Sequence, residues 1–224
     1  MSVGELTALT TTAESGHAAS IFLPIWAVLD DRELLAYYRA PRSAYFCAVA
    51  DVDEIRPEKI EAIMRDRFEF NGETHQLPEP IQWLANPSRD VEWHILLHKF
   101  YYAVGLGLAY EQSADASYAK RWMSLIDSWM LATPPDFIAA DVTGRRVQNW
   151  IYSYYYFVAH SPHDSTKIIS PAFHRRMLNS ICQQVEYLCE NLTPKRNHRT
   201  LELYAIFLAG VVFPEMRRAA YWRT

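Results

Sequence analysis

Apolar residues recur at intervals of three and four along most of the chain, which is the spacing of one face of an α-helix. The first long stripe consists of Trp93, Leu96, Leu97, Phe100, Tyr101, Val104 and Leu108. The second consists of Ala119, Trp122, Met123, Ile126, Trp129 and Met130. The third and most regular consists of Met177, Leu178, Ile181, Cys182, Val185, Leu188 and Cys189. No segment alternates apolar and polar residues over any length, so the pattern predicts an all-helical fold.

Polar and proline-containing segments separate the stripes and predict where helices end. These breakers are Glu111–Ser117, Thr133–Asp136, Ser161–Ser165 and the loop Asn191–Asn197. Ser170-Pro171 begins the next helix, because serine suits the N-cap and proline suits the first helical position. Helices of this length joined by short loops form antiparallel hairpins. Several hairpins in a row predict a bundle, a solenoid or a toroid, and no fixed-period repeat identifies a named solenoid.

The last helix is expected to begin near His198 or Arg199 and to continue to Tyr221–Thr224 without a stop signal. Its apolar residues occupy nearly every side, which is typical of a helix buried by several neighbours. They are Leu201, Tyr204, Ile206, Phe207, Leu208, Val211 and Val212. These faces need partners that the chain itself does not obviously supply. The pattern therefore predicts a truncated domain and self-association through the exposed C-terminal helix.

The region before Trp83 has a different pattern. Helices are predicted over Asp31–Tyr38 and Pro57–Arg67, and the stretch between Phe68 and Trp83 is extended and rich in turns, with Asn71-Gly72 as the turn signal. The first twenty residues are rich in Thr, Ser, Ala and Gly. We therefore expect residues 1–20 to form a disordered tail and residues 21–224 to form the domain.

Composition narrows the possible partners and compartments. Half of the 224 residues are apolar and the net charge is −4, with both signs mixed along the chain, so nucleic acid is not an expected partner. No apolar run approaches the about 18 residues that span a membrane, and the N-terminus has no basic and apolar signal segment. The three cysteines predict no disulfide scaffold. The sequence by itself predicts a cytoplasmic protein.

A polar cluster opens the last apolar helix: Asn197-His198-Arg199-Thr200-Leu201-Glu202. A helix N-terminus favours an anion, so the start of a buried helix is a good place for a binding site. The alternative is that Asn197 only caps the helix, as asparagine commonly does. Local pattern alone favours the capping role.

A second candidate is Arg145-Arg146-x-x-Asn149-Trp150, followed by the aromatic run Ile151–Tyr156. Guanidinium groups bind carboxylates and sulfates in a bidentate manner, and aromatic faces stack on sugars. An ordinary amphipathic helix with a solvated basic start explains the pattern equally well.

The third candidate is the pair His94 and His98, at i and i+4 of one helix, which is a spacing that can hold a metal. Ile95 stands where the glutamate of a His-Glu-x-x-His motif would be, and no further ligand lies nearby. Histidines hydrogen-bonded within the packing are the better interpretation, and we expect no metal site and no cofactor.

Several of these motifs occur in an order that resembles the N-terminal domain of heparinase II/III-like polysaccharide lyases. The resemblance covers about residues 34–222. The ordered motifs are Phe68-Glu69-Phe70-Asn71-Gly72, Ile81-Gln82-Trp83, Trp93-x-x-x-Leu97-His98-Lys99, Trp122 through Trp129, Arg146-x-x-Asn149-Trp150, Asn197-His198-x-x-x-Glu202, Phe207-Leu208-Ala209-Gly210 and Phe213-Pro214-Glu215. Each motif alone is weak, whereas the ordered set is specific.

The resemblance implies an incomplete (α/α) toroid and an acidic polysaccharide as partner. Full members of the family cleave uronic-acid glycans by β-elimination, in which a base removes the C5 proton and an acid protonates the leaving O4. Asn197 matches the family's carboxylate-neutralising asparagine and is the catalytic candidate; the substrate-binding candidates are His198, Arg146, Asn149, Trp150 and Glu202. By family, a periplasmic location is also compatible.

The chain departs from the family pattern in one important respect. The family's catalytic tyrosine and histidine lie downstream, and neither motif occurs in these 224 residues. The resemblance therefore implies a lyase-family protein that is inactive or very weak by itself. Two alternatives stay open: a non-catalytic module that binds acidic carbohydrate or assembles with a partner, and a glycosidase. A glycosidase needs two opposed carboxylates, and no such pair is marked out in the sequence.

Overall fold

The computed structural model describes residues 20–41, 46–134, 136–161, 167–194 and 196–224. Within them the fold is all-α apart from one small hairpin, and it forms part of an (α/α) toroid, as the pattern and the resemblance predict. The expected N-terminal tail lies outside the described residues except for Ser20. No described helix is long and apolar enough to cross a membrane.

The helices and strands follow one another along the chain in this order. The elements are α1 (Pro24–Ala27), α2 (Asp31–Arg39), α3 (Pro57–Ile63), β1 (Arg67–Phe70), β2 (Glu73–Gln76), α4 (Val91–Lys99), α5 (Tyr101–Ser113), α6 (Ala116–Ala132), α7 (Ala140–Tyr154), the π-helix η1 (Tyr155–Ala159), α8 (Pro171–Glu190), α9 (Arg196–Val212) and α10 (Ala219–Trp222).

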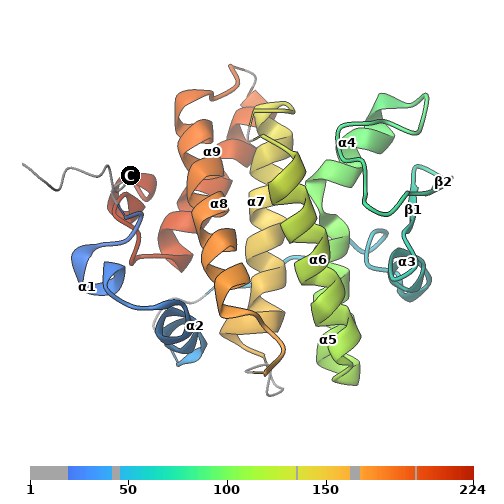
Figure 1. Cartoon of the computed structure of the whole chain (residues 1–224). Coiled ribbons are helices and arrows are strands. Elements are labelled where there is room, and N and C mark those ends of the chain that lie inside the picture. Colours follow the sequence, from blue (N-terminus) through green and yellow to red (C-terminus); the bar gives the residue numbers. More distant parts are fainter. Residues whose placement is uncertain (1–19, 42–45, 135, 162–166, 195) are drawn as a thin grey trace, which may run out of the picture.

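Helix α7 is the centre of the fold (Figure 1). It packs against α5 on one side and against α8 and α9 on the other, and α6 packs against both α5 and α8. Short polar connections join α5 to α6 and α8 to α9, so these pairs form antiparallel hairpins. Because α7 has helices on several sides, all but two of its residues are buried.

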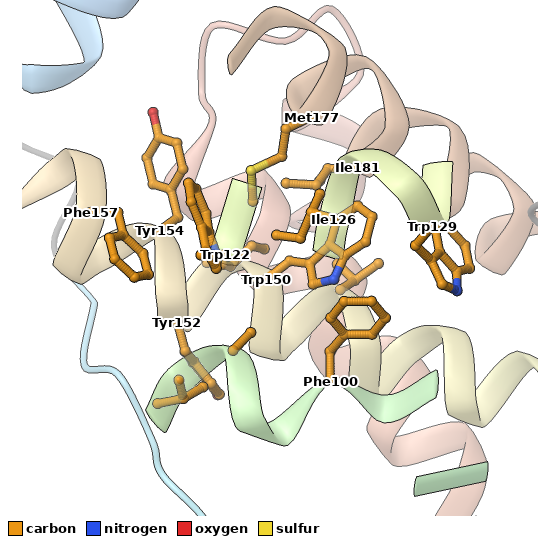
Figure 2. Packing of buried hydrophobic residues seen from close by; sticks show 14 of the residues in the cluster. Phe100, Trp122, Ile126, Trp129, Trp150, Tyr152, Tyr154, Phe157, Met177 and Ile181 are labelled. Atoms are coloured by element: carbon orange, nitrogen blue, oxygen red, sulfur yellow. The ribbon is translucent and has the colours of Figure 1, made fainter. Parts of the chain in front are cut away.

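Large aromatic side chains fill the space around α7. Trp122, Trp129 and Trp150 are each at most 1% exposed. The indole of Trp150 lies between the rings of Trp129, at 5.4 Å, and Phe100, at 5.6 Å, both nearly perpendicular to it (Figure 2). Such edge-to-face packing contributes about 0.5–1.5 kcal/mol per pair beyond the area that it buries. The tryptophans of the family-like motifs are therefore core residues.

The stripe from Trp93 to Leu108, expected to form one helix, is broken into two. Phe100 adopts a left-handed backbone conformation with φ 59°, which ends α4 and starts α5. Its ring is fully buried and stacks on Trp83 at 5.5 Å. The left-handed backbone disfavours a bulky residue, so the packing of this ring determines the break.

The prediction of one continuous C-terminal helix is wrong. Helix α9 ends at Val212, two residues before Pro214, and the separate four-residue helix α10 folds back onto it. Proline cannot continue a helix, and it disfavours helical geometry in the residue before it. The expectation that α9 is buried on every side is also wrong, because Leu203, Tyr204 and Phe207 are 46%, 43% and 48% exposed.

The N-terminal half agrees better with the sequence pattern. Helix α2 has the expected start, with Asp30 and Glu33 forming a capping box, while α3 ends at Ile63 rather than Arg67. The extended stretch contains an antiparallel hairpin whose turn is Asn71-Gly72, and it lies at the edge of the molecule (Figure 1). The segment before α1 pairs with the chain after α9 through an isolated bridge between Phe22 and Met216.

Candidate functional site

The N-terminal turns of α7 and α9 lie against each other and form the seam that carries the candidate site. A methyl group placed on Gly144 would lie only 3.2 Å from Cα of Glu202, so the two backbones approach very closely. The side-chain amide of Gln148 donates to the carbonyl of Leu201 at 2.8 Å. Farther along, the hydroxyls of Tyr152 and Tyr204 are 3.1 Å apart. These contacts fix the register of the two helices.

Asn197 and His198 stand at the exposed start of α9. The Nδ1 atom of His198 lies 2.5 Å from Oδ2 of Asp141 in the first turn of α7. The His198 side chain is 46% exposed, whereas that of Asp141 is 18% exposed. The seam thus presents an amide and an imidazole to solvent, and a carboxylate from the neighbouring helix holds the imidazole.

Glu202, one turn farther along α9, faces inward. It is fully buried, and its carboxylate accepts hydrogen bonds from the backbone N–H of Thr193, at 2.7 Å, and from the Thr193 hydroxyl, at 2.5 Å. Hydrogen bonds to a carboxylate are among the stronger ones in proteins. In this position Glu202 ties the loop before α9 to the helix, and so it sets where Asn197 and His198 stand.

Arg146 is completely buried beneath the seam. Its guanidinium lies 4.0 Å from the Trp129 ring centre and donates to Gln184 Oε1 at 2.7 Å, to Thr143 Oγ1 at 3.0 Å and to the carbonyl of His98 at 3.4 Å. Burial lowers the pKa of Arg146 to about 9. Its described hydrogen-bond partners are all neutral groups of the protein interior.

Asn149 and Trp150 share this interior location. The Asn149 amide donates to the carbonyl of Lys99 at 2.7 Å, and Trp150 is 0% exposed. The three residues of the Arg146-x-x-Asn149-Trp150 motif therefore join α7 to the break between α4 and α5. They underlie the seam in this structure and do not share the exposure of Asn197 and His198.

Arg145, the other arginine of the pair, is half-buried and one helical turn from Asp141 on the same side of α7. It donates to Gln148 Oε1 at 3.0 Å, and its guanidinium lies 5.8 Å from the Tyr101 ring centre. Among the described residues it forms no ion pair. Its spacing of four from Asp141 and three from Gln148, which is the spacing of one helical face, could have placed Arg145 on this side of α7 from the sequence.

His94 and His98 are hydrogen-bonded within the packing, as predicted. Both Nε2 atoms lie 2.9 Å from the carbonyl oxygen of Trp83, and Nδ1 of His98 accepts from Nε1–H of Trp129 at 3.0 Å. Burial, followed by the charge of Arg146, lowers the pKa of His98 to about 3. No group of three or more metal-ligating side chains occurs in the described part of the chain.

The exposed seam is suited to binding an anion. It combines the amide of Asn197, the imidazole of His198 and the guanidinium of Arg145 with the N-terminal end of α9, and all of these favour negative charge. The carboxylate of Asp141 at this end of the seam is engaged by His198. The described seam contains no arrangement of two opposed carboxylates of the kind that a glycosidase needs.

Comparison with known proteins identifies the same family that the ordered motifs resemble. The family profile described as the heparinase II/III N-terminus matches residues 29–224. A heparin-sulfate lyase of Pedobacter heparinus is 28% identical over 214 aligned residues, which cover 86% of this chain and 31% of that protein. The crystal structure of heparan sulfate lyase HepC from Pedobacter heparinus gives a TM-score of 0.73 at 26% identity, over 86% of this chain and 32% of that one.

A crystal structure of heparinase III gives a TM-score of 0.72 at 19% identity and shows likeness of fold alone. It covers 86% of this chain and 32% of that one. The chain thus spans about a third of the length of the relatives that it matches. The match of the N-terminal profile over most of the chain shows that this protein belongs to the heparinase II/III family.

Proposed function

We propose that the chain recognises a uronic-acid-containing polysaccharide at the seam between α7 and α9 and supplies the carboxylate-neutralising amide of a β-elimination. The observation that carries this proposal is the position of Asn197. It is exposed in the first turn of α9, beside an imidazole held by Asp141, and the resemblance of the Asn197-His198-x-x-x-Glu202 motif assigns it the role of the family's neutralising asparagine.

The chemistry requires such a group because a carboxylate makes the neighbouring C5 proton of a uronate poorly acidic. Removal of that proton places further negative charge on the carboxylate oxygens. A hydrogen-bond donor aimed at these oxygens stabilises the charge that develops in the transition state. The Asn197 amide takes this role, and His198 and Arg145 add donors along the same seam. Arg146, Asn149, Trp150 and Glu202 act beneath them by holding α7, α9 and the preceding loop in place.

The names of the relatives specify heparin and heparan sulfate, and this supports the proposed substrate class. We propose an acidic glycan of this class as ligand. We also propose that the chain binds the glycan without cleaving it at an appreciable rate. The motifs that carry the family's catalytic tyrosine and histidine do not occur among these 224 residues, and the chain spans about a third of the named lyase.

The test combines calorimetry with an absorbance assay for unsaturated uronate, using oligosaccharides of heparan sulfate, of unsulfated heparosan and of alginate. We expect Asn197→Ala to weaken binding by about tenfold, the size expected for loss of one hydrogen bond to a charged group. Its thermal unfolding should match that of the parent. Asn86→Ala is the control, because Asn86 is exposed in the loop before α4.

The outcomes separate the parts of the proposal. Binding that Asn197→Ala weakens, without a rise in absorbance, supports recognition without cleavage. A rise that Asn197→Ala abolishes would show a working lyase and would contradict the proposed inactivity. Equal binding by the parent and Asn197→Ala, or no binding to any glycan of the panel, would contradict recognition at the seam.

A further inference from the structure

The contact between Asp141 and His198 joins two helices at the exposed end of the seam. The 2.5 Å distance between His198 Nδ1 and Asp141 Oδ2 is that of a strong hydrogen bond. Asp141 comes from the first turn of α7, and His198 comes from the first turn of α9. Both helices can form without this contact, so its role lies in the candidate site and not in helix formation.

Asp141 has an obvious alternative role that it does not perform. An acidic residue in the first turn commonly caps a helix by accepting from backbone N–H groups. Yet α7 has Ala139 as its N-cap residue and no side-chain capping hydrogen bond. Among the described residues, the hydrogen bond of the Asp141 side chain goes to His198. The Asp141 carboxylate therefore hydrogen-bonds to the imidazole of His198 and does not cap α7.

This contact determines which ring nitrogen carries the proton. An ionised carboxylate only accepts hydrogen bonds, so Nδ1 of His198 must be the donor. In the neutral ring Nε2 then keeps its lone pair, and in the charged ring it becomes a second donor. In both states the edge of the ring that bears Nε2 is directed away from Asp141. Within four residues of the pair along these two helices, the described ionisable side chains are Arg145 on α7, and Arg199 and Glu202 on α9. Glu202 is turned inward onto Thr193.

We propose that Asp141 is a positioning residue that fixes the tautomer and direction of His198, so that Nε2 faces the bound uronate beside Asn197. This inference rests on the proposed function, because it names a further residue of the same site. Asp141 acts through His198 and does not itself touch the glycan, since a free carboxylate would repel an acidic ligand. The Asp141 side chain is 18% exposed and that of His198 is 46% exposed, so the imidazole is the more accessible partner of the pair.

The first test needs no glycan. At a pH where the ring is neutral, nitrogen-15 spectra of His198 should show the Nδ1-protonated tautomer in the parent protein. In Asp141→Ala the signals should move towards the Nε2-protonated form, and Asp141→Glu should restore the parent pattern. Asp53→Ala removes an equal charge from an exposed site and should leave the ring unchanged. A ring with the same tautomer in the parent and in Asp141→Ala would overturn the proposal.

The second test measures binding of a heparan sulfate oligosaccharide. Asp141→Ala and His198→Ala should each weaken it about tenfold, and the double variant should be no weaker than His198→Ala alone. Additive losses, or no loss in Asp141→Ala, would overturn the positioning role. If the parent binds no uronic-acid glycan, the proposed function fails and the glycan-facing role fails with it, while the spectra still decide whether Asp141 fixes the ring.

Discussion

His98 shows what burial does to a single titratable residue. Its ring is fully buried between Trp129 and the carbonyl of Trp83, with His94 and Arg146 nearby. Removal from water, added to the positive charge of Arg146, lowers the pKa of His98 from 6.5 to about 3. The folded protein therefore keeps this ring neutral, while the unfolded chain protonates it below about pH 6.5.

The sign of the pH dependence follows from that difference. Between about pH 6.5 and 3 the unfolded state binds the extra proton, so stability is fully present above this range and is lost as the pH falls. We expect the free energy of unfolding to fall by up to about 1.4 kcal/mol per pH unit from this residue. Denaturant titrations at pH 7 and pH 5 should show a smaller fall in His98→Gln than in the parent. Equal falls in His98→Gln and in the parent would contradict the prediction.

Arg146 is the second prediction at this scale. Arg146→Ala leaves a cavity beside Trp129 and removes the donors that Gln184 and Thr143 accept from. We expect a loss of about 3 kcal/mol or more in the free energy of unfolding. Arg146→Lys should also destabilise, because an ammonium cannot reproduce the planar fork. A variant that unfolds like the parent but loses glycan binding would show instead that Arg146 contacts the ligand directly.

Residue identity and spacing located this region, and the family-like motif selected Arg146 rather than Arg145 as the substrate-binding candidate. Arg145 and Arg146 are adjacent in the sequence, and one helical step of about 100° separates their directions. Either could face the ligand until the packing of Trp129 and Gln184 shows which one is enclosed. The same limit applies to Glu202, whose inward direction depends on Thr193 in a loop without regular pattern.

At the scale of elements, the existence of most helices could be predicted, because each is set by a local apolar stripe and a local breaker. Ser170-Pro171 starts α8 and Asn71-Gly72 turns the hairpin, as expected. The break at Phe100 could not be predicted, since a distant ring, Trp83, stabilises it. The end of α9 had a local signal in Pro214, and the apolar run on both sides of it concealed that signal.

The close approach of α7 and α9 gives the third prediction. Gly144→Ala places a methyl group 3.2 Å from the Glu202 Cα and 3.4 Å from the Leu201 carbonyl oxygen, and both are backbone atoms that cannot turn away. We expect the seam to open slightly, with a loss of about 1–3 kcal/mol in stability. Thermal unfolding measures the loss, and the His198 ring spectra should change with it. Helix propensity alone favours alanine over glycine. A variant as stable as the parent would show that α7 and α9 can move apart without a loss of stability.

At the scale of the whole molecule, one apolar surface lies open along α9 and α10. Leu203, Phe207 and Tyr221 are 46%, 48% and 58% exposed. They line a cavity of about 350 Å³ together with Ile206 and Trp222. A cluster of large, exposed apolar side chains on a protein surface commonly marks an interaction site. Self-association stays a prediction, and we propose this surface as its location, although α9 ends earlier than expected.

We expect the chain to associate with itself through this surface as its concentration rises, because association removes these side chains from water. Sedimentation velocity over a range of concentrations measures this directly. Phe207→Ser should shift the distribution towards monomer without lowering the unfolding temperature, because the side chain is half exposed. Leu131→Ser is the matched control, since Leu131 is 83% exposed on α6, away from the cavity. A parent protein that stays monomeric at every concentration would contradict the prediction, and equal effects of both variants would place the contact elsewhere.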